Sequence, residues 1–322
     1  MKLSFDTIKS ITAGAVRIWE ESDGVHFRKC TEKQLDAWYK LNPVLGKNAA
    51  ATTGIRLDFH TNSSTFAFTA PIGNKFEIYI NDILMHAIYE QDLSDRSFKI
   101  NIDKSSNEEN RITLILPSHD FAGVISSIEL DNGASVVPHN FDCKILFIGD
   151  SITQGWDSGW DSLSYAYRVS RFFNAESIIH GVGGGFFHES LIDEEMTFDP
   201  DVVIIAFGTN DWGCHSSLAQ LEEQAEKFLN GIAKQYEGKK IFAISPIYRG
   251  ATEGEIRGTG TFKEVCDSVK KQIIASGITL IDGFTLTPHL GEFFSDVTLH
   301  PNALGFGIYA ENLIRTLQSY MK

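Results

Sequence analysis

Apolar and polar residues follow two different patterns along the chain. In the first 140 or so residues they alternate, which is typical of antiparallel strands with one buried face. Clear alternation runs through residues 55–60, 76–80 and 98–102, and turn-forming Gly, Asn, Asp and Ser residues separate such runs. The pattern predicts an all-β domain over residues 1–140, a sandwich or jelly roll, with one short helix from Thr31 to Trp38.

Beyond residue 140, continuous apolar runs alternate with segments of helical spacing. The expected strands are residues 145–148, 177–179, 202–207, 241–244 and 278–281. Runs without alternation fit strands buried on both faces, so the order predicts an α/β domain of three layers with a parallel sheet over residues 141–322. Its last helix is expected to open with Pro301, because proline is favoured at the first helical position.

Size and charge narrow the function classes. The 322 residues suffice for two domains, and the net charge of -14 disfavours nucleic acid or an anionic membrane as a partner. The N-terminus lacks the apolar core of a signal peptide, and no long uncharged segment could span a bilayer. The four cysteines are widely spaced and indicate no disulfide framework. We therefore expect a soluble cytoplasmic protein with reduced thiols, and the sequence does not indicate an oligomeric state.

Polar clusters follow several of the predicted strands. They are Gly149-Asp150-Ser151, residues 180–185, Gly208-Thr209-Asn210-Asp211 and residues 296–301, which end in His300-Pro301. The carboxyl ends of parallel strands meet at one edge of a sheet, where ligands bind. Together the clusters supply a hydroxyl nucleophile, glycine N–H groups, an amide donor and a histidine base, which are the parts needed for acyl transfer.

Three other interpretations of these residues fail on spacing. A dinucleotide-binding fingerprint counted from Gly181 would need glycine where Phe186 stands. The nucleophile elbow of α/β-hydrolases would need glycine at Thr153. Asp211, Cys214 and His215 match no compact metal-ligand pattern. The sequence therefore predicts neither a cofactor nor a metal.

From residue 143 to residue 322 the chain resembles the SGNH hydrolases, also called GDSL esterases. The resemblance implies a flavodoxin-like sheet, Ser151 as nucleophile and His300 as its base. It also implies an oxyanion hole made of the Ser151 N–H, a glycine N–H and the Asn210 side chain. We prefer Gly185 to Gly184 for that glycine by counting from His180, although His180 and Val182 replace the residues usual in the family, which leaves the register open by one residue.

The acid that orients the histidine departs from the family pattern. In the family it stands three residues before the histidine, whereas Asp296 stands four before His300 and position 297 is valine. One extra loop residue would still bring Asp296 to the ring. The alternative is a histidine oriented by a backbone carbonyl, as in the two-domain family-two carbohydrate esterases.

The β-rich module ahead of an SGNH-type domain resembles carbohydrate esterases that remove acetyl groups from sugars. We expect a serine esterase acting on small acyl esters, above all acetyl esters, of a small molecule or oligosaccharide. Aromatic residues near the motifs either stack on sugar rings or pack the loops; these are Trp156, Trp160, Phe186, Phe187 and Trp212. Of these, we expect Trp156, Phe186 and Trp212 to bind the substrate. An acyltransferase, a thioesterase or a lysophospholipase on the same scaffold are alternatives, as is a carbohydrate-binding protein without catalysis.

Overall fold

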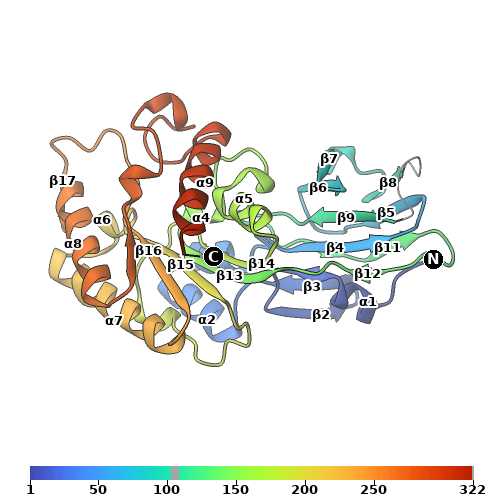
Figure 1. Ribbon diagram of the computed structural model, residues 1–322, viewed down its shortest axis with the longest axis horizontal. Helices are drawn as coiled ribbons and strands as arrows, with labels where there is room; N and C mark the ends of the chain where they lie inside the picture. The colour runs from blue at the N-terminus through green and yellow to red at the C-terminus, as the bar shows by residue number, and fades with distance from the viewer. Residues whose placement is uncertain (103–108, 321–322) are drawn as a thin grey trace.

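The computed structural model describes residues 1–102 and 109–320, and it places a β-rich part beside an α/β part (Figure 1). The parallel sheet consists of β13 (Cys143–Gly149), β14 (Ala175–Gly181), β15 (Val202–Ala206), β16 (Lys240–Ile244) and β19 (Thr279–Ile281). Each matches a predicted strand. Their spatial order is β14-β13-β15-β16-β19, the flavodoxin-like order, in which ligands bind at the carboxyl edge beside the first strand.

Helices cover both faces of this sheet. One face carries α5 (Tyr165–Phe172) and α9 (Ala303–Gln318), whose Tyr165 and Tyr309 rings stack with centroids 4.1 Å apart. The other carries α7 (Leu218–Gln235) and α8 (Phe262–Ala275), with the short α4 (Ser151–Gln154) and α6 (Asp211–Cys214) at the carboxyl edge. The predicted start of α9 at Pro301 is wrong: Asn302 caps the helix through its side chain and Ala303 is its first residue.

The N-terminal part is built from antiparallel sheets, as the alternation predicts. Its strands are β1 (Thr12–Ala13), β2 (Arg17–Glu21), β3 (Gly24–Arg28), β4 (Arg56–Thr61), β5 (Thr65–Thr69), β6 (Lys75–Ile80), β7 (Ile83–Tyr89), β8 (Ser97–Asn101), β9 (Asn110–Ile115), β10 (Val124–Ile125), β11 (Ser127–Leu130) and β12 (Val137–Pro138). The remaining elements are α1 (Phe5–Ser10), five 3-10 turns within the described residues and the hairpin of β17 (Ile256–Arg257) and β18 (Gly260–Thr261). Alternate side chains of the strands fill a core of their own, which includes Phe59, Phe68 and Ile112.

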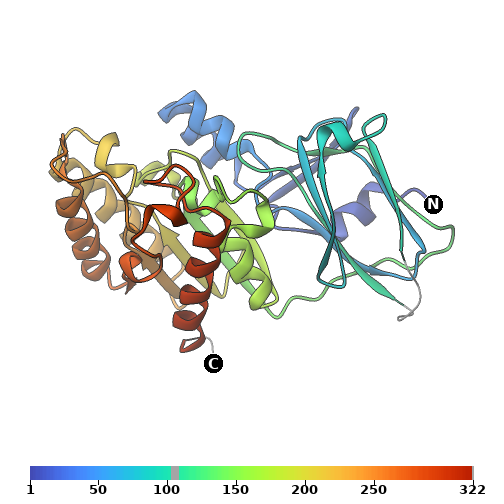
Figure 2. The ribbon, with the colours of Figure 1, turned by 90° about the horizontal axis from the view of Figure 1, so that it is seen from above.

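One helical segment of the N-terminal part packs on the α/β part instead. It consists of α2 (Glu32–Leu41), which confirms the predicted helix and starts with a Thr31–Gln34 capping box, and α3 (Pro43–Ala50). Trp38 of α2 shares an apolar cluster with Phe228 and Val265 of the α7–α8 layer. Figure 2 shows these blue helices leaning away from the strands toward the α/β part. The domain boundary at residue 140 stays a prediction, but the core of the α/β part draws on residues on both sides of it.

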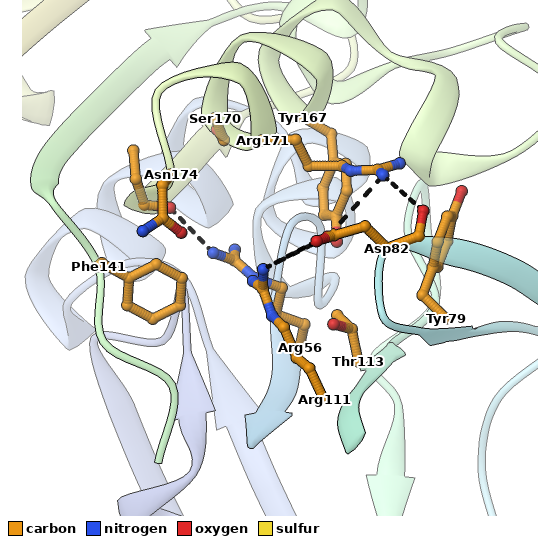
Figure 3. Close-up of a pocket in the computed structure, with 11 residues that line it drawn as sticks. Arg56, Tyr79, Asp82, Arg111, Thr113, Phe141, Tyr167, Ser170, Arg171 and Asn174 are labelled. Carbon is orange, nitrogen blue, oxygen red and sulfur yellow. Dashed lines mark hydrogen bonds and ion pairs between the residues drawn. The ribbon is translucent and has the colours of Figure 1, made fainter. Parts of the chain in front are cut away.

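Charged residues join the two parts at the amino edge of the parallel sheet (Figure 3). Buried Arg56 donates from Nη2 to the carbonyl of Ala175, the first residue of β14, at 2.9 Å, and from Nε to Asp58 at 3.2 Å. Arg111 donates from Nε and Nη2 to both oxygens of Asp58 at 2.8 Å. Buried pairs of this geometry hold their members in one arrangement. The contact between the two parts is therefore a directional polar junction at this edge.

Candidate active site

Ser151 stands at the carboxyl end of β13, as the sequence predicts. The strand ends at Gly149, where an added Cβ would lie 2.7 Å from the carbonyl oxygen of Ala206, so only glycine fits. Asp150 caps α4 by accepting from the Ile152 N–H at 2.9 Å, which makes Ser151 the first helical residue. Burial, reinforced by the charge of Asp211, raises the pKa of Asp150 to about 7, although the Ile152 N–H lowers it. Asp150 therefore shapes the turn and lies away from solvent.

Ser151, His300 and Asp296 lie in one line of hydrogen bonds. Ser151 Oγ is 2.9 Å from His300 Nε2, and His300 Nδ1 is 3.1 Å from Asp296 Oδ2. The other oxygen of Asp296 accepts from the N–H groups of Thr298, Leu299 and His300 at 3.0, 2.7 and 3.1 Å. Burial would raise the pKa of Asp296, but these N–H groups and His300 hold it below its usual range. The loop thus favours an ionised carboxylate beside the imidazole.

The same loop explains the unusual spacing of Asp296. Val297 adopts a left-handed backbone with φ of 68°, which is rare for a β-branched residue. The left-handed turn at Val297 accommodates the extra residue, so that the following N–H groups still surround the Asp296 carboxylate. His300 lies before the Asn302 cap, outside α9, so the helix does not hold the ring directly.

A second carboxylate, Asp157, also faces the imidazole and was missed by sequence reasoning. Its Oδ2 lies 3.4 Å from His300 Nδ1, the nitrogen that Asp296 also contacts. Asp157 belongs to the loop after α4 and has a left-handed φ of 67°. No spacing rule connects an acid six residues after the serine to a histidine near the C-terminus, so only the folded chain reveals it.

The glycine-rich segment after β14 forms a tight turn. The Gly185 N–H donates to the Val182 carbonyl at 2.8 Å, and Gly184 has a φ of +81°, as in a type II turn. Gly185 is buried, whereas Gly184 is exposed. Within residues 1–102 and 109–320, no acceptor binds the Gly184 N–H. This geometry favours Gly184 over Gly185, the residue preferred from the sequence, as a donor to a ligand.

Asn210 faces the same turn. Its Nδ2 donates to the Gly185 carbonyl at 2.9 Å, which leaves the second N–H of the amide for another acceptor. The next residue, Asp211, accepts from the Phe187 N–H at 3.0 Å and from His215 Nε2 at 2.9 Å. Asp211 therefore ties the loop after β14 to the loop after β15, and Asn210 is held between them.

The aromatic residues differ in their access to solvent. Trp212 is fully buried: its Nε1 donates to Gly260 and the Arg257 guanidinium lies 3.8 Å from the ring centroid. The expectation that Trp212 binds the substrate is therefore wrong, because the ring is buried and Arg257 covers it. Phe187 is also buried, whereas Trp156, Trp160 and Phe186 are half-buried. Trp156 donates to Gln154 and Trp160 contacts Tyr89 of the β-rich part.

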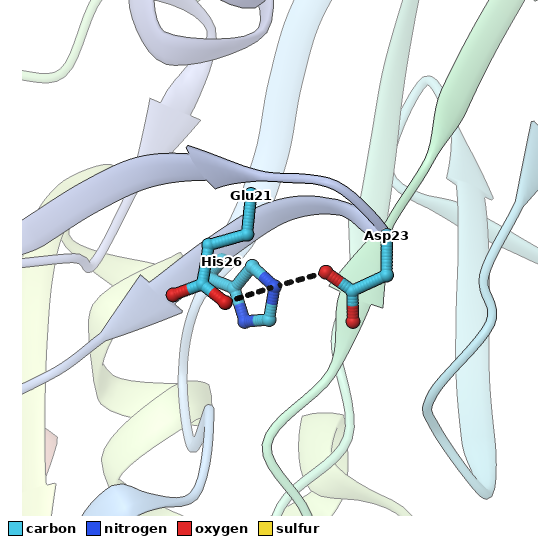
Figure 4. Close-up of side chains that lie close together, drawn as sticks. All are labelled: Glu21, Asp23 and His26. Carbon is cyan, nitrogen blue, oxygen red and sulfur yellow. Dashed lines mark hydrogen bonds and ion pairs between the residues drawn. The ribbon is translucent and has the colours of Figure 1, made fainter.

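Two groups of side chains in the described residues have the donor types and spacing of a metal site. One is Asp157, Asp296 and His300, which already form the hydrogen-bonded cluster around the imidazole. The other is Glu21, Asp23 and His26 on the hairpin of β2 and β3 (Figure 4). There His26 Nε2 lies 2.7 Å from Asp23 Oδ1, and this contact lowers the pKa of Asp23. The hairpin group is thus accounted for as a surface hydrogen bond.

Solved structures with this fold span both parts of the chain. A salicylyl-acyltransferase, SsfX3, from a tetracycline biosynthetic pathway is 15% identical with a TM-score of 0.78, covering 96% of this chain and 94% of that chain. A putative GDSL-like lipase from Bacteroides ovatus is 16% identical with a TM-score of 0.74, covering 99% and 97%. A family two carbohydrate esterase from Cellvibrio japonicus is 13% identical with a TM-score of 0.71, covering 100% and 98%. No curated protein was found to match the chain.

These matches show that the chain shares the fold of those structures over both of its parts. Residues 147–308 match the GDSL-like Lipase/Acylhydrolase family, and the chain belongs to that family. The matched segment contains Ser151, Asn210 and His300. None of the helices in residues 1–102 and 109–320 combines the length and apolar composition needed to cross a membrane.

Proposed function

We propose that the protein is a serine esterase that hydrolyses acetyl esters of carbohydrates, with Ser151 as nucleophile. The observation that carries the proposal is the alignment of Ser151 Oγ, His300 and Asp296, with separations of 2.9 and 3.1 Å. A serine oxygen is a nucleophile only when a base removes its proton, and a carboxylate on the far nitrogen keeps the base in the required tautomer.

The reaction runs in two halves. His300 Nε2 takes the Ser151 proton as Oγ attacks the ester carbonyl, and it returns that proton to the sugar oxygen that leaves. Water then attacks the acetyl-serine, His300 takes one proton from the water, acetate departs and Ser151 Oγ regains its proton. The oxyanion of each tetrahedral intermediate accepts from the Ser151 N–H, the Gly184 N–H and the second Asn210 N–H.

Two observations support a carbohydrate ester as the substrate: the similar structures and the aromatic residues near the catalytic loops. Family two carbohydrate esterases and an acetyl xylan esterase are among the similar structures. Half-buried Trp156 and Phe186 offer ring faces beside the catalytic loops. The contact of Trp160, in the loop after α4, with Tyr89 of β7 supports a site in which residues 1–140, a jelly-roll-like module in this proposal, form one wall.

The test combines a variant with a substrate series. We expect Ser151→Ala to abolish hydrolysis of chromogenic acetyl esters and acetylated oligosaccharides, with an unchanged melting temperature, because the hydroxyl contributes little packing. We also expect acetyl esters to be turned over faster than octanoyl esters. Retained turnover in Ser151→Ala would disprove the nucleophile, and a preference for octanoyl esters would replace the sugar deacetylase with a lipase-like enzyme.

A second function, acyl transfer, is supported by the salicylyl-acyltransferase, which covers nearly the whole chain. The chemistry differs only in the second half, where an alcohol replaces water. Adding methanol or a free sugar during turnover distinguishes the two functions: a transferase forms more new ester than acid at millimolar acceptor, and an esterase forms mainly acid.

A further inference from the structure

The N-terminal helix α3 reaches the glycine turn beside the proposed nucleophile. Asn48 of α3 is almost fully buried and donates from Nδ2 to the Gly183 carbonyl at 2.9 Å. Gly183 also donates its own N–H to Gln154 Oε1 at 2.6 Å. Both polar groups of this one residue are therefore held by side chains, one from each part of the molecule.

These contacts close into a ring. Gln154, three residues after Ser151, donates from Nε2 back to the Asn48 carbonyl at 3.0 Å. The buried Lys29 donates to the same carbonyl at 3.1 Å. An added Cβ at Gly183 would lie 2.8 Å from Asn48 Nδ2, so the ring also explains why this position is glycine. Side-chain amides give directional hydrogen bonds, and a closed set of them allows one arrangement.

The direction of the next N–H follows from peptide geometry. In a trans peptide the carbonyl of one residue and the N–H of the next point to opposite sides of one plane. Asn48 holds the Gly183 carbonyl on the buried side, so the Gly184 N–H points to the opposite side, toward solvent. A rotation of this plane would turn the donor away from any oxyanion that it serves.

We propose that Asn48 is a positioning residue for catalysis: by holding the Gly183 carbonyl, it sets the glycine turn that supplies an oxyanion N–H. The proposal rests on the proposed function. It makes the N-terminal part a component of the catalytic machinery as well as a wall of the substrate site.

The test compares two buried amides of the same helical segment. Asn48→Ala removes the donor to Gly183, and Gln34→Ala removes a matched donor on α2, which binds the Leu191 carbonyl at 3.1 Å and does not touch the turn. We expect Asn48→Ala to lower kcat about 10- to 100-fold with KM within threefold, because misaligned donors act mainly on the transition state. We expect Gln34→Ala to keep kcat within threefold, with a similar fall in melting temperature. If Asn48→Ala does not fold, Asn48→Ser takes its place with the same expectation.

Methylboronic acid supplies a readout that a purely structural role does not move. It forms a tetrahedral adduct with an active serine and mimics the intermediate. Its inhibition constant should rise in Asn48→Ala by the factor by which kcat/KM falls, and stay unchanged in Gln34→Ala. Equal losses of kcat in both variants, or an unchanged kcat or inhibition constant in Asn48→Ala, would overturn the proposal. Activity in Ser151→Ala would instead overturn the proposed function, so the two failures are distinct.

Discussion

The two ends of strand β14 are each bound by a side chain from the N-terminal part, and the two contacts differ in kind. At the amino end, the Ala175 carbonyl accepts from the Arg56 guanidinium. Just beyond the carboxyl end, the Gly183 carbonyl accepts from the Asn48 amide. The first belongs to an ionic cluster remote from Ser151, and the second belongs to a network of amides and hydroxyls around the catalytic loops. We infer that the contact at the amino end of β14 joins the two parts of the molecule, and that the contact beyond its carboxyl end positions the catalytic loops.

The pKa values of buried ionisable groups also differ between the amino end of β14 and the rest of the junction. Burial would raise the pKa of Asp58, but the hydrogen bond from Arg111 and the charge of Arg56 hold it below its usual range. At the carboxyl end, burial lowers the pKa of Lys29 to about 7, and beside the loop between α4 and α5 burial raises the pKa of Glu77 to about 7. Opposite charges in direct contact remain ionised, whereas buried groups without such a partner titrate near neutrality. Asp58 at the amino end therefore keeps its charge, whereas Lys29 and Glu77 respond to pH.

The largest expected effect is at the carboxyl end, in the support of His300. We expect Asp296→Asn to lower kcat about 10- to 100-fold, less than the roughly 10⁴-fold loss of a triad left with no carboxylate, because Asp157 can accept from the same nitrogen. Asp157→Asn should cost only a few-fold. The double variant should approach the full loss of about 10⁴.

The measurement is a double-mutant cycle on kcat with melting temperatures as the control for folding. A double variant no worse than Asp296→Asn would show that Asp157 plays no part. If Asp296→Asn and the double variant both stay within a few-fold of wild type while His300→Ala is inactive, a backbone carbonyl orients the histidine.

The sequence predicts a residue of the candidate site only where that residue belongs to a short motif of neighbouring residues. Ser151 and Asn210 stand in short motifs just after strands, His300 stands in a short motif just before the last helix, and the five strands of the described sheet follow from apolar runs. Asp157, Asn48 and Arg257 have no such signal, because each acts on a residue far away in the chain. Helical spacing predicts α2, but an apolar stripe does not say which core receives it. The turn hydrogen bond that occupies the Gly185 N–H likewise depends on backbone angles that the Gly183-Gly184-Gly185 run leaves free.

The next effect tests the oxyanion donors. We expect Asn210→Ala to lower kcat by about 10² to 10³, the loss typical for one donor. The control is Asn312→Ala, which removes an amide that donates to the Leu286 carbonyl on the face of α9. That variant should keep its kcat. An unchanged rate in Asn210→Ala would mean that the amide only holds the Gly185 carbonyl.

The amino end is expected to affect stability without affecting turnover. Arg56→Met leaves Asp58 with one cation and removes the donor to Ala175, so we expect a loss of about 3–5 kcal/mol in the free energy of unfolding. Arg171→Met, at the same junction, removes a more exposed cation 3.9 Å from Asp82 and should cost at most about 1 kcal/mol. Urea unfolding measures both. A large fall in kcat for folded Arg56→Met would show that the amino end of β14 also affects catalysis, and would contradict the separation of roles between its two ends.

The smallest effect concerns pH and the buried carboxyl of Glu77. Glu77 accepts from the Ser162 N–H at 3.0 Å and from the Ser162 hydroxyl, and burial, then the charge of Asp161, raises its pKa from 4.5 to about 7. A carboxyl with a raised folded pKa stabilises the fold fully below its unfolded pKa and loses that contribution as pH rises through the folded pKa. The free energy of unfolding should therefore fall between about pH 4.5 and 7, by roughly 1–3 kcal/mol from this group.

Glu77→Gln keeps the shape of the side chain and cannot titrate, so it should flatten the dependence of the free energy of unfolding on pH. Glu129→Gln, on the exposed side of β11, should leave that dependence unchanged. Parallel slopes in wild type and Glu77→Gln would mean that Glu77 stays ionised, and Glu77 would then resemble Asp58 at the amino end.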